Sequence, residues 1–222
     1  MATQTSNYIE AIHNLSPGGT LIFHEVPWED YEQLLDELVD RPGVRVNYVR
    51  GRLEIMTLSQ FHEMYADLLQ DLALMTAERM GFDFESRGSA THKKKSFRSG
   101  AEPDGCFYVQ NAAQIIGKRK IDLNRDPAPD IIVEIDVSHT SLYKLDFYAH
   151  LGVPEFWRYD EKRLHIYHLI EQSYIEAQVS RAFPVLTSDS LTQFLEQSKT
   201  EGQSAARRAF GQWLKVNLPV TD

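Results

Sequence analysis

Residues 130–137 read Asp-Ile-Ile-Val-Glu-Ile-Asp-Val, and this stretch decides the fold that the sequence predicts. β-branched residues dominate it, which favours a β-strand. Side chains of a strand point alternately to opposite faces, so one face of this strand is wholly aliphatic. That face consists of Ile131, Val133, Ile135 and Val137. An aliphatic face of this kind predicts that the strand is anchored in a hydrophobic core.

The opposite face of the same stretch carries acids around a single aliphatic residue, Ile132. Glu134 and Asp136 alternate on this face and stand roughly 6–7 Å apart along the strand. A buried carboxylate is costly unless it is paired or bound to a metal. We therefore interpret this face as part of a functional site. The alternative is a solvated face at the edge of a sheet.

A second acidic pair lies upstream, where Glu102 and Asp104 occupy alternate positions beside Pro103 and Gly105. The glycine would let a backbone or a ligand approach closely. This segment predicts a strand over 102–109, with a Pro-Asp-Gly turn as the alternative. Together the two acidic pairs form the oxygen-rich set that hard divalent cations require.

Outward from these strands, hydrophobic periodicity predicts the remaining elements. The clearest helix, over 59–80, has an apolar stripe of Phe61, Met64, Tyr65, Leu68, Leu72 and Met75. The other predicted helices cover 27–39, 141–151, 190–197 and 203–216. The other predicted strands cover 21–24, 44–49, 53–56, 155–159, 164–169 and 174–179, with a hairpin of 82–85 and 91–95. Alternating strands and helices favour a mixed α/β sheet.

Length and composition limit the class of protein. The 222 residues suit one domain, which we expect over 20–222 with helices at its C-terminal end, after a flexible lead or short helix in 1–19. With 42% hydrophobic residues the chain can build a core. It shows no secretory signal and no apolar run near the roughly 20 residues that span a bilayer. A single cysteine, Cys106, suits a reducing compartment, so we expect a cytoplasmic protein.

The net charge of −9 disfavours binding to nucleic acid, because phosphates attract clustered Lys and Arg. Residues 92–98 form one positively charged cluster in this otherwise negatively charged chain. It contains Lys93, Lys94, Lys95 and Arg98. We interpret it as a phosphate-contacting segment; the alternative is a solvated loop or hairpin tip.

Three segments carry a family resemblance: GAEPDGCFYV at 100–109, DPAPDIIVEID at 126–136 and YAHLGVPEFW at 148–157. In order and spacing they resemble the Uma-two family of restriction-endonuclease-like proteins, first catalogued as a domain of unknown function. Residues 50–56 and the pair His62-Glu63 also fit, and the resemblance covers about residues 20–195. It implies the α/β (α+β) core of the PD-(D/E)XK nuclease superfamily, a mixed central sheet flanked by helices.

The resemblance assigns roles residue by residue. Asp104 falls on the first acid of the superfamily motif and Glu134 on the second. Asp136 occupies the third position, which is normally lysine. Lys144 matches a lysine of related sequences and would supply the ammonium from the following helix; the alternative is a surface lysine. Glu63 would add a carboxylate, or else lies on a solvated helix face.

The implied function is that of an endonuclease that hydrolyses DNA phosphodiester bonds with Mg²⁺ or Mn²⁺. Asp104 and Glu134, with Glu63, would hold the metal, and Lys144 and Asp136 would complete the catalytic group. DNA is then the expected partner, and a homodimer is expected by analogy with the superfamily. The alternative is a non-catalytic nuclease-fold binding or assembly module, because lysine is missing at position 136. A sugar hydrolase with paired carboxylates explains the acids but not the family pattern.

Overall fold

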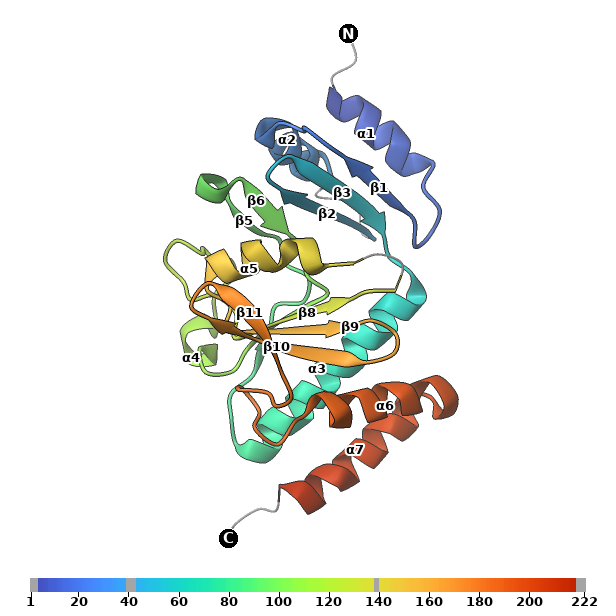
Figure 1. Ribbon diagram of the computed structural model, residues 1–222, viewed down its shortest axis with the longest axis vertical. Helices are drawn as coiled ribbons and strands as arrows, with labels where there is room; N and C mark the ends of the chain where they lie inside the picture. The colour runs from blue at the N-terminus through green and yellow to red at the C-terminus, as the bar shows by residue number, and fades with distance from the viewer. Residues whose placement is uncertain (1–3, 39–42, 138–139, 219–222) are drawn as a thin grey trace. The chain divides into compact units, whose positions relative to one another are not determined.

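A computed structural model describes residues 4–38, 43–137 and 140–218. The chain forms a mixed α+β structure with two sheets (Figure 1). It divides into two compact units, which are described separately. Unit 1 comprises Met1–Gln60 and Thr91–Glu102, and unit 2 comprises Phe61–Ala90 and Pro103–Asp222. Within the described residues, no helix combines the length and the apolar composition needed to cross a membrane.

Unit 1 is built on a five-stranded antiparallel sheet in the order β1-β3-β2-β6-β5. Its elements are α1 (Gln4–His13), β1 (Thr20–Phe23), α2 (Trp28–Leu38), β2 (Val44–Val49), β3 (Arg52–Thr57), β5 (His92–Lys94), the 3₁₀ helix η1 (Lys95–Phe97) and β6 (Ser99–Ala101). Residues Gln4–His13 are therefore helical, and Tyr8 and Ile12 of this helix are buried in the core of the unit.

Aromatic rings fill the centre of unit 1. The rings of Tyr31 and Tyr48 stack with their centroids 5.0 Å apart, and Trp28 lies 5.1 Å from Tyr31. Gly100 of β6 borders this cluster so closely that a Cβ there would lie 2.1 Å from Oη of Tyr31. The glycine is therefore required by close packing.

Unit 2 is built on a six-stranded sheet in the order β11-β10-β9-β8-β7-β4. Its elements are α3 (Gln60–Met80), β4 (Glu85–Ser86), β7 (Gly105–Tyr108), α4 (Ala112–Ile115), β8 (Ile131–Ile135), the 3₁₀ helix η2 (Leu142–Lys144), α5 (Leu145–Leu151), β9 (Glu155–Tyr159), β10 (Leu164–Ile170), β11 (Ser173–Ala177), α6 (Ser188–Glu201) and α7 (Gln203–Asn217). Strand β8 is antiparallel to β7 and parallel to β9, so the sheet is mixed.

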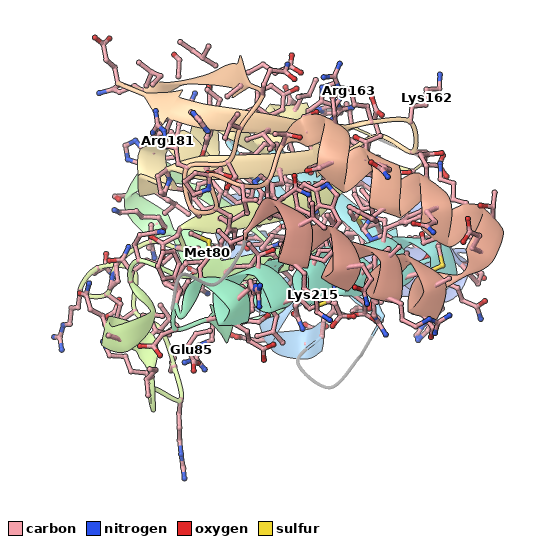
Figure 2. All side chains as sticks on the ribbon, turned by 90° about the horizontal axis from the view of Figure 1, so that it is seen from below. Met80, Glu85, Lys162, Arg163, Arg181 and Lys215 are labelled. Atoms are coloured by element: carbon pink, nitrogen blue, oxygen red, sulfur yellow. The ribbon has the colours of Figure 1, made fainter. Side chains whose placement is uncertain are left out.

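The aliphatic face of β8 lies in the core of unit 2, as predicted. Ile131, Val133 and Ile135 are buried in one cluster with apolar residues of α3, α6 and α7. Figure 1 shows α5 on the other side of β8 and β9. Figure 2 shows α6 and α7 side by side beneath the sheet. Both faces of β8 are thus covered, and the solvated-edge alternative is wrong.

Three sequence predictions need correction. The strand predicted over 102–109 is shorter, since only Gly105–Tyr108 (β7) is a strand. Residues 102–104 connect β7 to β6 of the other sheet, and Pro103 among them has no N–H to donate to a ladder. The hairpin of 82–85 and 91–95 does not form, since β4 pairs with β7 and β5 with β6. Phe61 was predicted to belong to the apolar stripe of α3, but its side chain is 62% exposed, whereas the side chain of its neighbour His62 is buried.

The sequence predicts a lead over 1–19 and one domain over 20–222. These boundaries stay a prediction, and the two compact units are described independently of them.

Candidate functional site

Asp104 is held against β8 by that strand's own backbone. Its N–H donates to the carbonyl oxygen of Val133 at 3.0 Å, and its Oδ2 accepts from the N–H of Ile135 at 2.7 Å. The carboxylate therefore takes a hydrogen bond that β8 would otherwise give to a neighbouring strand. This arrangement places the first predicted acid at the start of β7, next to the last residues of β8.

Glu134 points to the side of β8 that α5 covers. Lys144 Nζ lies 2.7 Å from its Oε2, and Tyr148 donates from Oη to its Oε1 at 2.5 Å. Lys144 is 1% exposed and Glu134 is 3% exposed. Lys144 is therefore no surface lysine, and that alternative is wrong.

The electrostatics of Glu134 reflect burial and both neighbouring charges. Removal from water raises the pKa of Glu134, and the negative charge of Asp104 raises this pKa further. The ammonium of Lys144 and its hydrogen bond act in the opposite direction. The pKa of the Tyr148 phenol is also raised, first by burial and then by Glu134. The charge of Asp104 thus acts on Glu134.

The α3 residue brought to Asp104 is His62. Its Nδ1 lies 3.2 Å from Oδ1 of Asp104, and both side chains are buried. Glu63, the acid predicted from this helix, is exposed. The sequence could not choose between these neighbours, because the choice depends on how α3 is rotated against the sheet.

Tyr148 was not singled out from the sequence, although a signal for it exists. Lys144 and Tyr148 are four positions apart, and side chains at that spacing share one face of a helix. Both of them contact Glu134. A tyrosine one turn after a candidate lysine could therefore have been predicted to join the same carboxylate.

Asp136 is engaged in contacts that hold the chain together. It is ion-paired with Arg158 of β9, and its two oxygens accept from the N–H of Ser141 at 3.0 and 3.1 Å. These contacts fix the chain where it approaches η2. A catalytic role for Asp136, predicted from its motif position, stays a prediction.

The other acids of the sequence pattern are also bound by the fold. Asp130 Oδ2 accepts from the N–H groups of Val109 and Asn111 at 2.7 and 2.9 Å. Glu102 belongs to unit 1, where its oxygens bind Val46 N–H and the Thr91 hydroxyl. The predicted oxygen-rich cluster therefore reduces to Asp104 and Glu134.

A divalent cation fits the chemistry of this pair. Magnesium is commonly held by one or two carboxylates, with waters and substrate phosphates completing the shell. Burial, and after it the charge of Asp104, raises the pKa of Glu134, and a cation bound beside this carboxylate would favour its ionised form. Within residues 4–38, 43–137 and 140–218, no group of three or more His, Cys, Asp or Glu side chains is arranged to hold a metal.

The predicted basic segment lies in unit 1, on β5, η1 and the residue after it. Lys93 and Lys95 are exposed, and their Nζ atoms lie 3.3 and 3.7 Å from the carboxylate of Glu32. Lys94 is half-buried, and Arg98 is exposed with a left-handed backbone (φ 45°). Part of the segment's positive charge is thus neutralised locally.

A protein-family model described as "Putative restriction endonuclease", Uma2, matches residues 28–198. The chain belongs to the Uma2 family. The resemblance seen in the three sequence segments is thereby confirmed. No curated protein matches the sequence.

Among solved structures, the chain is similar to a crystal structure titled as a "putative nuclease belonging to DUF820" from Anabaena variabilis. The two share 17% sequence identity with a TM-score of 0.48, over 72% of this chain and 98% of the other.

Proposed function

We propose that this Uma2 protein is a metal-dependent nuclease that hydrolyses DNA phosphodiester bonds at Asp104 and Glu134. One observation carries the proposal. Two carboxylates thirty positions apart in the chain belong to neighbouring segments, since Asp104, just before β7, accepts a hydrogen bond from β8, the strand that carries Glu134. A buried lysine contacts Glu134. The family description points to the same class of reaction.

Asp104 and Glu134 would hold Mg²⁺ or Mn²⁺, which supplies polarisation of the scissile phosphate and activation of water when bound. The hydrogen bond from Ile135 N–H fixes the orientation of Asp104. Lys144 and Tyr148 do the same for Glu134. The Lys144 ammonium would orient the attacking water or stabilise the negative charge that develops on the phosphate. Lys144 thereby takes over the task of the lysine that is absent at position 136.

DNA is the proposed partner, with Lys93, Lys94, Lys95 and Arg98 guiding its backbone. Glu63 remains a candidate for a further metal ligand, although it is exposed in this structure. A homodimer remains an expectation by analogy with the superfamily.

The test is cleavage of plasmid, linear and single-stranded DNA by purified protein with Mg²⁺ or Mn²⁺. We expect cleavage to fall at least about a hundredfold in Asp104→Asn, Glu134→Gln and Lys144→Met, since loss of a group that stabilises transition-state charge has this size. Asp67→Asn, which removes an exposed acid of α3, is the matched control and should cleave like the wild type. Equal cleavage by all variants would identify a contaminant and remove the support for this site.

A non-catalytic module is the second candidate, favoured by the structural engagement of Asp136 where the superfamily has lysine. Calorimetric titration with Mn²⁺ separates the two functions. A nuclease site binds the ion and loses it in Glu134→Gln, whereas a module of this fold needs no metal binding.

A further inference from the structure

Helix α7 is the one α-helix of the described chain that carries more basic than acidic residues. It contains Arg207, Arg208 and Lys215, and no Asp or Glu. By contrast, α1, α2, α3, α5 and α6 each contain more Asp and Glu than Lys and Arg. The chain as a whole has a net charge of −9. A local excess of positive charge in such a chain indicates a surface for an anionic partner.

An apolar stripe fixes the orientation of α7 within unit 2. Ala206, Phe210 and Leu214 are spaced four residues apart and are buried in the core of the unit. Side chains at this spacing lie on one face of a helix. Arg207, beside this stripe, is ion-paired with Asp71 of α3. The remaining faces of α7 are therefore held in fixed directions.

A groove of about 520 Å³ follows the side of α7 next to α3. Its lining includes Met75 of α3 and, from α7, Arg207, Arg208, Gly211 and Lys215. A Cβ at Gly211 would lie 3.2 Å from Cε of Met75, so the glycine keeps this part of the groove free of a side chain. None of the described acids lines the groove. Its charged lining is therefore entirely positive.

Two of these cations point to the same side of the helix. Arg208 and Lys215 are seven residues apart, which is about two turns, or about 10 Å along the helix axis. Both side chains are exposed, and Figure 2 shows Lys215 on α7. Within the part of the chain that the structure describes, neither has an ion-pair partner, unlike Arg207. Gln212, between them in the sequence, also lines the groove and adds an amide donor.

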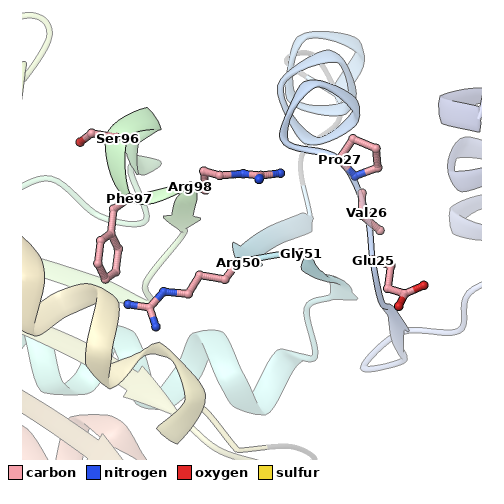
Figure 3. A pocket seen from close by; sticks show the side chains of 8 residues that line it. All are labelled: Glu25, Val26, Pro27, Arg50, Gly51, Ser96, Phe97 and Arg98. Carbon is pink, nitrogen blue, oxygen red and sulfur yellow. The ribbon is translucent and has the colours of Figure 1, made fainter.

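The basic pocket of unit 1 lacks this convergence. Arg50 and Arg98 both have left-handed backbones (φ 48° and 45°), which are strained for residues other than glycine. They line a cavity of about 640 Å³, but their side chains point in different directions (Figure 3). One anion would not meet both. The α7 groove is therefore the better-defined cationic surface of the two.

The chemistry of the groove fits a nucleic-acid backbone. Phosphates recur along a strand, and Arg, Lys and Gln are among the side chains that contact them. A membrane surface is a poorer fit, because a helix that lies on a membrane buries an apolar face in it. The apolar stripe of α7 is already buried in the core of unit 2.

We propose that the groove beside α7 binds the phosphate backbone of DNA through Arg208 and Lys215. Helix α7 follows residues 28–198, which the Uma2 family model matches, so the surface lies outside the matched segment. The choice of DNA as the partner rests on the proposed function. Binding itself requires neither a metal ion nor the Asp104–Glu134 pair, and it can be measured where cleavage does not occur.

The test is fluorescence-anisotropy titration of a labelled DNA duplex and a labelled single strand with the full chain in EDTA. Salt is varied between about 50 and 200 mM, a range over which phosphate contacts lose much of their affinity. The variants are Arg208→Gln, Lys215→Gln, the double variant and Arg208→Lys, which keeps the charge. Arg125→Gln and Lys162→Gln remove exposed cations of unit 2 outside α7 and are the matched controls. Poly-glutamate is the competitor that represents an acidic protein.

The dependence of binding on salt should report the two contacts directly. On the duplex, each glutamine variant should reduce the slope of log affinity against log salt by about 0.9, and the double variant by about twice that. Arg208→Lys and both controls should keep the wild-type slope. On the single strand each contact should contribute about 0.7. Tighter binding of one probe identifies the form of DNA that the groove prefers.

Four results would overturn the proposal. They are no DNA binding by the wild type, an unchanged slope in the double variant, an equal loss of slope in the controls, and competition by poly-glutamate as strong as by unlabelled DNA. Because EDTA prevents metal-dependent cleavage, a protein that binds through α7 but never cleaves would refute the proposed function alone.

Discussion

Lys144 Nζ lies 2.7 Å from Oε2 of Glu134, and water reaches neither side chain. Removing one partner of a buried ion pair is strongly destabilising, because it leaves the other charge buried and uncompensated. The cost of separating these two groups is therefore large, whatever the pair does in catalysis.

The Lys144–Glu134 pair should dominate the stability of the α5 side of the sheet. We expect Lys144→Met to lower the free energy of unfolding by about 3–5 kcal/mol, the usual cost of stranding one member of a buried pair. Urea denaturation followed by circular dichroism measures this. The double variant Lys144→Met/Glu134→Gln should recover much of the loss, because neither member of the pair is then left as a charge without its partner. A single variant as stable as the wild type would contradict the pairing.

Tyr148 should tune the protonation of Glu134. Its hydrogen bond to Oε1 lowers the pKa of Glu134, so Tyr148→Phe should raise that pKa further. Metal binding, which needs the ionised carboxylate, should then require a higher pH. We expect Mn²⁺ affinity to fall by about tenfold at neutral pH, the value of one hydrogen bond to a charged group, and to recover in alkaline buffer. A pH profile of calorimetric affinity checks this, and an unshifted profile would refute it.

His92 should make unit 1 sensitive to acid. Burial lowers its pKa from 6.5 to about 4. Between these values the unfolded chain binds a proton that the folded chain does not, so stability is complete above pH 6.5 and falls as the pH drops towards 4. The loss should reach about 3 kcal/mol. Urea denaturation over pH 4–7 measures it.

The matched control for His92 is the exposed His24 of the same unit. His92→Gln should flatten the pH dependence in this window, and His24→Gln should not. The same slope in both variants would assign the acid sensitivity to other groups.

Replacing Gly100 by a residue with a Cβ should destabilise the protein as long as Tyr31 keeps its hydroxyl. A Cβ at Gly100 would lie 2.1 Å from Tyr31 Oη, and the Tyr31 ring is fixed by Trp28 and Tyr48. Gly100→Ala should therefore cost about 1–3 kcal/mol through overpacking. Thermal denaturation of Gly100→Ala, Tyr31→Phe and the double variant tests this. Removal of the hydroxyl should rescue part of the loss, because Cζ of residue 31 would still lie 2.9 Å from the added Cβ. Additive losses would show that the clash with the hydroxyl is relieved elsewhere.

Local pattern predicted much of unit 2. The alternation in β8 correctly separated the aliphatic face from the Glu134 face, and the stop residues after α5 and α3 placed both helix ends. These features depend on neighbours in the sequence. The spacing of Lys144 and Tyr148 could have predicted their shared contact for the same reason.

Other features depend on tertiary contacts, which the local sequence pattern does not reveal. Glu102 and Asp104 look alike in the sequence, yet one is bound in unit 1 and the other against β8. His62 and Glu63 are adjacent on α3, and only the rotation of the helix decides which one meets Asp104. The strained arginines at positions 50 and 98 appear only once backbone angles are known.

We expect Asp104 and Glu134 to bind one divalent cation together. Calorimetric titration with Mn²⁺ of the wild type, Asp104→Asn, Glu134→Gln and the double variant measures this binding. The wild type should bind one ion per chain, either substitution alone should abolish most of the affinity, and the second should add little. Undiminished binding in both single variants, or no binding in the folded wild type, would refute a shared cation site.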